Sequence, residues 1–112
     1  MAKSPEHRDL FSGALELMIL HSLRLKPMHG YALAKHIKQV SDDLLKIEEG
    51  SLYPALQKML LKGWVSGEWG ISETNRKVRF YRLTPAGRKQ LQAELSNYDR
   101  VTEAIQAVLR TA

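Results

Sequence analysis

The chain has 112 residues, a net charge of +5 at neutral pH, 44% hydrophobic residues and no cysteine. This length predicts one domain with a modest core, which pairing with a second copy would enlarge. The lack of cysteine excludes disulfides and cysteine-based metal sites, and no apolar run is long enough to span a bilayer. With no signal-peptide pattern at the N-terminus, these features predict a cytoplasmic protein without a membrane partner.

The excess positive charge is concentrated in one segment. Residues 74–83 contain four basic residues and no acidic one, and the isoelectric point is near 9.6. Such a charge balance is typical of proteins that bind nucleic acid, although it also suits an anionic membrane surface.

The first predicted element is a helix over residues 10–25 with apolar residues on two sides. Such a helix is either buried within one small domain or wedged between its own core and a partner subunit. One face contains Phe11, Leu15, Met18, Ile19, Ser22 and Leu23, and the other contains Leu10, Gly13, Ala14, Leu17 and Leu20.

Residues 26–30 break this helix, and the pattern predicts a second helix over 30–40. We expect Tyr31, Leu33, Ala34 and Ile37 to face inward and Lys35 to face outward. Residues 44–47 are compatible with a minimal strand.

A third helix is predicted to begin at Ser51, a favourable N-cap, or at the acidic residues before it. A start at Ser51 places Pro54 in the first turn, where its missing N–H costs little. Gly63 is expected to end the helix. The core face contains Leu52, Leu56, Met59 and Leu60, and the outer face contains Tyr53, Pro54, Gln57 and Lys58.

A long hairpin follows, with strands over 64–69 and 78–83 and a polar loop over 70–77. Thr84 and Pro85 then fit the N-cap and first position of a helix that reaches about Leu109. This helix carries a heptad pattern that predicts packing on a second chain. The pattern contains Leu91, Leu95, Tyr98, Thr102, Ile105 and Leu109, and is widened by Val101 and Val108.

The third helix and the hairpin have the residue types of a DNA-reading helix and a phosphate-binding wing. Two plainer interpretations remain: a solvated helix face, and an edge strand whose basic residues block aggregation. The candidate DNA-contacting residues are Lys35, Ser51, Tyr53, Pro54, Gln57, Lys58, Arg76, Lys77 and Arg79.

The sequence gives little support for catalysis or for a cofactor. It lacks a glycine-rich phosphate loop and a nucleophile elbow. His29 and His36 are spaced to share a helix face, but no carboxylate or cysteine lies at ligand spacing, so we expect no metal.

Tyr98 suggests a small-molecule cavity between the subunits of a dimer, lined also by Leu10, Ala14 and Leu17. Aromatic side chains between helices bind flat apolar ligands. The alternative is an aromatic ring that only fills the core of the dimer.

Five segments, in this order and spacing, resemble the PadR family of transcriptional regulators, in its short subgroup with one C-terminal helix. They are LMIL at 17–20, PMHGY at 27–31, GSLYPAL at 50–56, WG at 69–70 and FYRLTPAG at 80–87. The resemblance implies a winged helix-turn-helix fold, a homodimer held by the first and last helices, and repression of a nearby operon. It also implies that the helix from Ser51 is the recognition helix and that residues 76–79 form the wing.

Short members of the family bind planar, cationic or phenolic compounds in the central cavity of the dimer, and Tyr98 matches the aromatic residue that faces it. The chain departs from the family at the wing, where Thr74 and Asn75 replace paired glycines and Val78 replaces a basic residue or proline. Glu49 also stands where proline is frequent. Asparagine tolerates a positive φ, so the wing turn remains feasible.

We therefore expect a mostly α-helical fold with a small β-hairpin, a DNA-binding domain over residues 1–83 and a dimerisation helix over 84–112. The predicted function is a homodimeric repressor, not an enzyme, which binds a near-palindromic operator in double-stranded DNA and is released by a small aromatic or phenolic ligand. The alternatives are a winged helix that binds protein, and a ligand-binding dimer without a DNA role.

Overall fold

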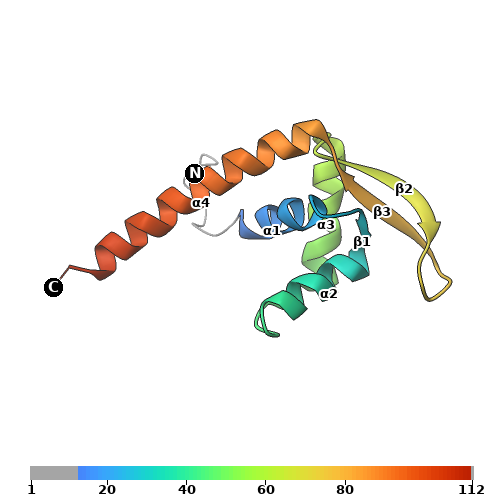
Figure 1. Ribbon diagram of the computed structural model, residues 1–112, viewed down its shortest axis with the longest axis horizontal. Coiled ribbons are helices and arrows are strands. Elements are labelled where there is room, and N and C mark those ends of the chain that lie inside the picture. Colours follow the sequence, from blue (N-terminus) through green and yellow to red (C-terminus); the bar gives the residue numbers. More distant parts are fainter. Residues whose placement is uncertain (1–12, 112) are drawn as a thin grey trace.

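The structure, a computed structural model, describes residues 13–111 (Figure 1). The predicted part of the first helix before residue 13, which includes Leu10, lies outside the described residues. The elements are α1 (Ala14–Leu23), β1 (Met28–His29), α2 (Gly30–Val40), α3 (Glu49–Leu61), β2 (Val65–Ile71), β3 (Lys77–Leu83) and α4 (Pro85–Leu109).

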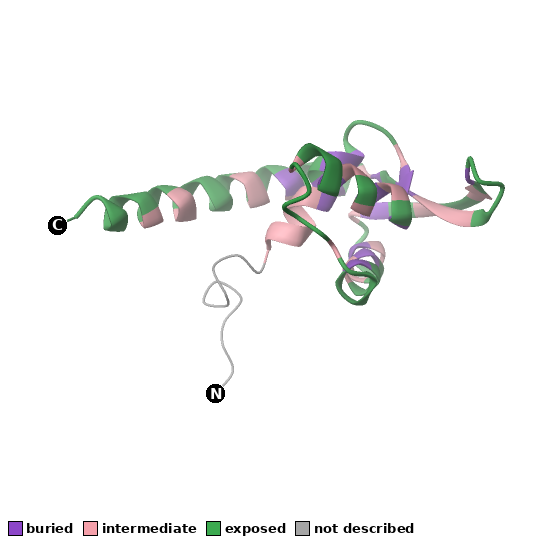
Figure 2. Cartoon of the chain, turned by 90° about the horizontal axis from the view of Figure 1, so that it is seen from below, coloured by how far each residue is buried: buried purple, intermediate pink, exposed green. Residues whose placement is uncertain are grey.

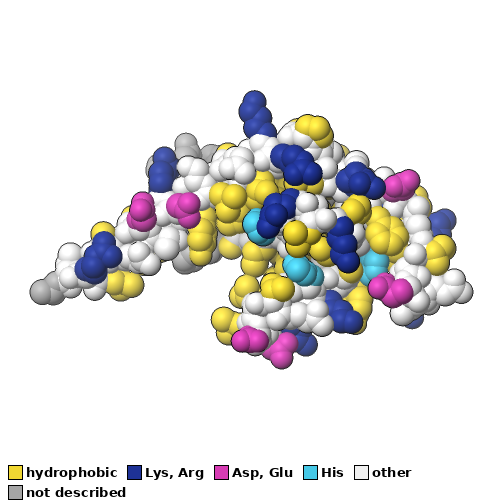
Figure 3. All heavy atoms as spheres, viewed as in Figure 1, with side chains coloured by type: hydrophobic (Ala, Val, Ile, Leu, Met, Phe, Trp, Pro, Cys, Tyr) yellow, Lys and Arg dark blue, Asp and Glu magenta, His cyan; other side chains and the backbone are white. Residues whose placement is uncertain are grey.

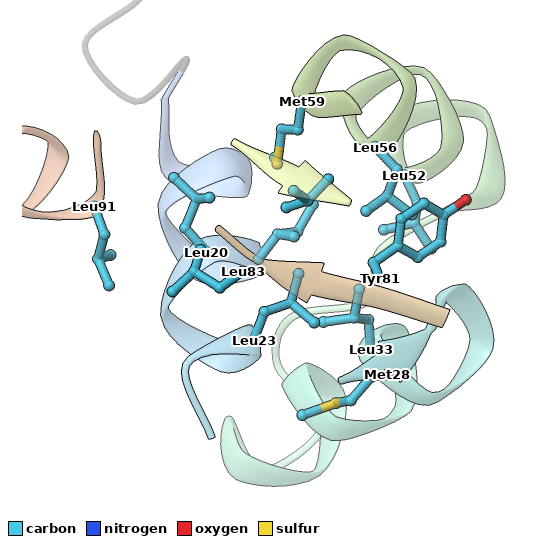
Figure 4. Close-up of a cluster of buried hydrophobic side chains, with 12 residues drawn as sticks. Leu20, Leu23, Met28, Leu33, Leu52, Leu56, Met59, Tyr81, Leu83 and Leu91 are labelled. Atoms are coloured by element: carbon cyan, nitrogen blue, oxygen red, sulfur yellow. The ribbon is translucent and has the colours of Figure 1, made fainter. Parts of the chain in front are cut away.

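The fold is mostly helical with a small sheet, as the sequence predicts. Helices α1–α3 form a compact body, and β2 and β3 project from it as a wing (Figure 1). The core forms where α1, α2 and α3 meet the base of this hairpin, and its side chains converge from all of these elements (Figure 4). Its largest fully buried residues are Ile19, Leu20, Leu33, Leu52, Leu56 and Met59.

The sheet has a third strand that the sequence did not predict. The short β1 pairs antiparallel with β3, so that the strand order is β1-β3-β2. The register places Met28 opposite Tyr81 and His29 opposite Phe80. A two-residue strand has no alternation to detect, and only its tertiary partner identifies it.

The minimal strand proposed for residues 44–47 is wrong. Asp42 and Asp43 adopt positive φ angles of 55° and 65°, and the residues that follow form no strand. The outer edge of β3 is already occupied by β1, and Leu44 is 81% exposed.

Helix α3 begins at Glu49 with Glu48 as its N-cap, which corrects the start at Ser51 and agrees with the acidic alternative. Pro54 consequently lies inside the helix and not in its first turn. Its missing N–H leaves the carbonyl of Gly50 without the usual donor, but both residues are exposed to water. Gly63, with a φ of 77°, follows the C-cap as predicted.

The start of α4 is fixed by contacts with the start of the wing. The Thr84 hydroxyl caps the helix by accepting a hydrogen bond from the Gly87 N–H at 3.0 Å. The Thr84 backbone N–H donates to the Trp64 carbonyl at 3.1 Å. Gly87 lies so close to this carbonyl that it leaves no room for a β-carbon. These contacts join the wing and α4 at one point.

The predicted heptad pattern is divided between two environments. Leu91 is only 3% exposed and belongs to the core of its own chain, against which Leu95 also packs. Leu91 therefore lies within one chain and is not part of an exposed seam. Beyond this region α4 extends away from the body, and much of its surface is exposed (Figure 2).

The structure predicts opposite effects of alanine at two glycines. Gly87→Ala should lower the free energy of unfolding by at least about 2 kcal/mol, because the new methyl group meets the Trp64 carbonyl. Gly50→Ala, where a β-carbon has open space in a helix, should raise it by up to about 1 kcal/mol. Urea denaturation at one protein concentration, followed by circular dichroism, measures both, and equal effects would contradict the assigned contact.

Candidate nucleic-acid interface

A groove of about 720 Å³ lies between the wing, the first residues of α2 and the first half of α3. We call it the wing groove. Four of the predicted DNA-contacting residues line it together, namely Tyr53, Arg76, Lys77 and Arg79. Three others, Ser51, Pro54 and Gln57, are exposed on α3.

Tyr53 is held in position by contact with the start of α2. Its hydroxyl oxygen would lie 2.6 Å from a β-carbon at Gly30, so the ring packs directly on the glycine. His29 caps the same helix, because its Nδ1 accepts a hydrogen bond from the Ala32 N–H at 3.3 Å. The helix N-terminus and the tyrosine hydroxyl therefore face the same side, which suits contact with DNA phosphates.

The wing owes its shape to a tight turn within the predicted polar loop over residues 70–77. Ser72 is 8% exposed. Its hydroxyl accepts a hydrogen bond from the Arg76 N–H at 3.2 Å, and its own N–H donates to the Arg76 carbonyl at 2.8 Å. Asn75 has a φ of 61°, which confirms that asparagine supplies the turn in place of glycine. This turn leaves Arg76 exposed at the tip.

Two basic side chains of β3, Lys77 and Arg79, lie beside Trp69, which is not among the residues predicted from the sequence to contact DNA. The Lys77 Nζ lies 5.2 Å from the centre of the Trp69 ring, and the Arg79 guanidinium carbon lies 5.8 Å from it. Trp69 faces Arg79 in the strand register, a cross-strand relation that the length of the hairpin could have indicated. These cation–π contacts hold two positive charges beside the groove.

Lys58 does not lie with the other candidate residues. Its ammonium pairs with the Glu16 carboxylate of α1 at 2.8 Å, and the Glu16 side chain is only 13% exposed. Lys58 thus faces α1 inside its own chain, so we remove it from the DNA-reading face. The sequence pattern placed it outward because helical spacing alone cannot show which neighbour covers that edge of α3.

Two residues of α2 complete the comparison with the predicted positions: Tyr31 does not face inward, and Lys35 does not line the wing groove. Tyr31, predicted to face inward, is 69% exposed and lines the wing groove. Lys35 is exposed, as predicted, but lines a separate hollow of about 430 Å³.

Local contacts shift the pKa values of two groups in this region, the Glu73 carboxyl and the Tyr81 hydroxyl. A hydrogen bond from its own backbone amide, followed by the neighbouring His29 ring, lowers the pKa of the Glu73 carboxyl. Burial raises the pKa of the Tyr81 hydroxyl, which therefore stays protonated at neutral pH. On the face shown in Figure 3, Lys and Arg side chains gather over the body, and acidic groups lie toward its edges.

Three of the four residues of the predicted ligand cavity lie on α1 and α4 and do not line the wing groove, and the fourth, Leu10, lies outside the described residues. Ala14 and Leu17 are partly buried on α1, and Tyr98 is 43% exposed on α4. The two helices pack side by side (Figure 1). Among residues 13–111, no group of three or more metal-ligand side chains occurs, and no helix has the length and apolar character to cross a bilayer.

Residues 19–93 match the model of the transcriptional regulator PadR-like family. The chain belongs to this family. It is 31% identical, over 75% of both chains, to the transcriptional regulator Rv3488 of Mycobacterium tuberculosis.

Solved structures agree with this assignment. A transcriptional regulator from Clostridium thermocellum is 27% identical, with a TM-score of 0.80 over 88% of this chain and 96% of its own. A PadR family regulator from Eggerthella lenta is also 27% identical, with a TM-score of 0.75 over 92% and 88%. The protein is therefore a PadR-like, DNA-binding transcriptional regulator with a winged helix fold, and its family is one of regulators and not of enzymes.

The positions of Gln57 and Lys58 predict different effects of alanine. Gln57→Ala should reduce discrimination at one or two base pairs by about 1–3 kcal/mol, with little change in non-specific affinity. Lys58→Ala should leave DNA binding unchanged and lower the free energy of unfolding by at most about 1 kcal/mol, the usual range for a partly exposed ion pair. Binding to an operator and to its single-base variants measures the first effect, and urea denaturation the second. Loss of discrimination in Lys58→Ala would return that residue to the reading face.

Proposed function

We propose that this PadR-like regulator is a homodimeric repressor that binds a near-palindromic operator in double-stranded DNA. The observation that carries the proposal is that Tyr53 of α3 lines one groove together with the basic residues of the wing, while other polar residues of α3 are exposed to solvent. A helix of this size fits the major groove, and the wing cations would then meet the backbone beside it.

The exposed half of α4 supports the homodimer. Tyr98, Val108 and Leu109 are 43%, 68% and 75% exposed, and Ile105 lies between them in the heptad pattern. An apolar stripe of this kind on a projecting helix is stabilised by packing against another chain. A two-fold dimer would present two α3 helices to successive turns of DNA, so the operator should be a rough palindrome.

A small aromatic or phenolic effector is the proposed signal for release. Tyr98 on α4, with Ala14 and Leu17 on α1, would line its site between the subunits, and Leu10 is a fourth candidate. Such a ligand acts only if it binds the DNA-competent and the released states with different affinities.

Tyr98→Ala should abolish ligand-induced release and retain DNA binding. As a regulator of transcription, the protein would act in the cytoplasm.

Binding to DNA is tested by fluorescence anisotropy, with the DNA upstream of the protein's own gene and a scrambled control at two salt concentrations. We expect selective binding that weakens steeply with salt, because each neutralised phosphate releases counterions. Arg76→Ala should lower the slope of log affinity against log salt by about one.

Arg110→Ala is the matched control, since it removes the same charge at the far end of α4. Weak, equal and salt-insensitive binding to both DNAs would contradict the proposal. It would favour a winged helix that binds protein, or a ligand-binding dimer without a DNA role.

The dimer is tested by a charge at the exposed stripe. Ile105→Glu should raise the dimer dissociation constant at least about 100-fold, because each subunit would bury an unpaired carboxylate. Gln106→Glu adds the same charge at an exposed neighbouring position and should leave the dimer intact. Light scattering across a concentration series measures both, and an intact Ile105→Glu dimer would show that α4 does not form the interface here.

A further inference from the structure

A basic hollow lies between α2 and the turn that leads into α3. It has a volume of about 430 Å³, and Lys35, Lys38 and Lys46 line it with a single carboxylate, that of Asp43. We call it the lysine hollow. Lys35 is among the residues predicted to contact DNA, whereas Lys38 and Lys46 have no role in the proposed function. Three cations against one anion favour a negatively charged occupant.

The end of α2 fixes the turn that carries Lys46. The Asp43 N–H donates a hydrogen bond to the Lys38 carbonyl at 2.8 Å, and the Ser41 hydroxyl accepts one from the Leu45 N–H at 3.0 Å. Asp43 has a positive φ of 65°, which is typical of a chain reversal at the end of a helix. Lys46 is thereby brought back beside the lysines of α2, where all three side chains line one hollow.

The lysine hollow and the wing groove adjoin at Tyr31, which lines both. The Tyr31 ring is stacked on the His29 ring, with 6.4 Å between the ring centres and 13° between the planes. Tyr31, Lys35 and Lys38 are four and three residues apart, so they share one face of α2. This face leads from the wing toward the C-terminal end of α2, which points away from the wing (Figure 1). The basic surface of the wing is thus extended along α2.

The three lysines are accessible to an anion. All three are exposed, and in the part of the chain that the structure describes none of them forms an ion pair. Lys58, by contrast, is paired with Glu16. Single lysines on a helix surface are commonly only solvated, but these three come from two segments and meet at one hollow. Such convergence concentrates positive potential where one phosphate can contact more than one ammonium group.

We propose that the lysine hollow binds a phosphate group of the DNA backbone, beyond the stretch of backbone that the wing contacts. The ammonium groups of Lys35, Lys38 and Lys46 donate hydrogen bonds to the phosphate oxygens. This inference rests on the proposed function and extends it, because each subunit then holds the duplex at both ends of the surface that contains α3. Phosphate contacts carry no sequence information, so the hollow adds affinity for every duplex and leaves discrimination to α3.

Asp43 opposes this contact. Its carboxylate lines the same hollow and repels a phosphate, so it lowers the affinity for all DNAs alike. Removal of this negative charge should therefore strengthen DNA binding, whereas removal of the lysines should weaken it. Two opposite effects at one hollow indicate contact with an anion, and a loss of folding cannot produce both.

The lysines are tested in the anisotropy assay with the double variant Lys38→Ala/Lys46→Ala. We expect its affinity for the upstream DNA and for the scrambled control to fall by the same factor, about tenfold or more, and the salt slope to fall by at least about one for each half-site. Lys89→Ala/Arg110→Ala removes the same charge from exposed positions that line neither the lysine hollow nor the wing groove, and should behave as the wild type. Circular dichroism confirms that both variants are folded. Equal binding by the two double variants would overturn the proposal.

Asp43→Asn is the opposite test. Asparagine keeps the size of the side chain and tolerates the positive φ, and the variant should bind both DNAs about threefold or more tightly, with unchanged selectivity. Asp99→Asn removes the same charge from an exposed position on α4 and should leave the affinity unchanged. The role of Asp43 is refuted by an unchanged affinity in Asp43→Asn, or by an equal gain in Asp99→Asn.

Uncharged DNA linkages locate the contact. A methylphosphonate removes the charge of one phosphate, and we place it at successive positions of the bound DNA. At the position that meets the lysine hollow it should weaken binding by the wild type and have no effect on Lys38→Ala/Lys46→Ala. Arg76→Ala should be insensitive at a different position. If the two variants were insensitive at the same position, the lysine hollow would not make a separate contact.

The outcomes separate this inference from the proposed function. A wild-type protein that binds no duplex selectively contradicts the proposed function and the inference with it. Selective, salt-dependent binding by the wild type that the substitutions at Lys38 and Lys46 leave unchanged contradicts the inference alone.

Discussion

The arrangement of this protein depends on the Trp64 carbonyl group, where the end of α3, the start of the wing and the start of α4 meet. The Thr84 backbone N–H donates to this oxygen at 3.1 Å, and the Thr84 hydroxyl lies 2.9 Å from it. Gly87 approaches so closely that only a residue without a side chain fits. One carbonyl thus determines where the wing leaves the body and in which direction α4 projects.

Two glycines have a similar role beside the wing groove. Gly30 lets the Tyr53 ring of α3 pack on the first turn of α2, and Gly67 lets the Arg79 guanidinium pack against β2. In both cases the glycine leaves room for a neighbouring side chain that a β-carbon would displace. The groove is therefore shaped by packing within the chain before any partner binds, and such preorganisation reduces the entropy that is lost on binding.

The basic residues of the chain fall into groups with different tasks. Lys58 stabilises the contact between α3 and α1 through Glu16, and Lys77 and Arg79 are held beside Trp69. Arg76 is exposed at the wing tip. Net charge alone gives these residues equal weight, whereas their neighbours separate structural cations from those that are free to meet an anion.

The sequence by itself determined the features that depend on local interactions. Spacing and residue type were enough to predict the end of α3 at Gly63, the start of α4 at Thr84, the hairpin and the buried face of α3. Capping and amphipathic periodicity act within a few residues, so the sequence contains them directly. The order of the short motifs also indicated the family. Only the tertiary structure decided the pairing of β1 with β3, the burial of Leu91 within its own chain, the ion pair of Lys58 with Glu16 and the meeting of His29, Trp69 and Arg79 around one groove. Each of these features joins residues that are far apart in the chain. Which residues meet depends on how whole helices and strands pack, and the periodicity of one segment carries no information about that packing.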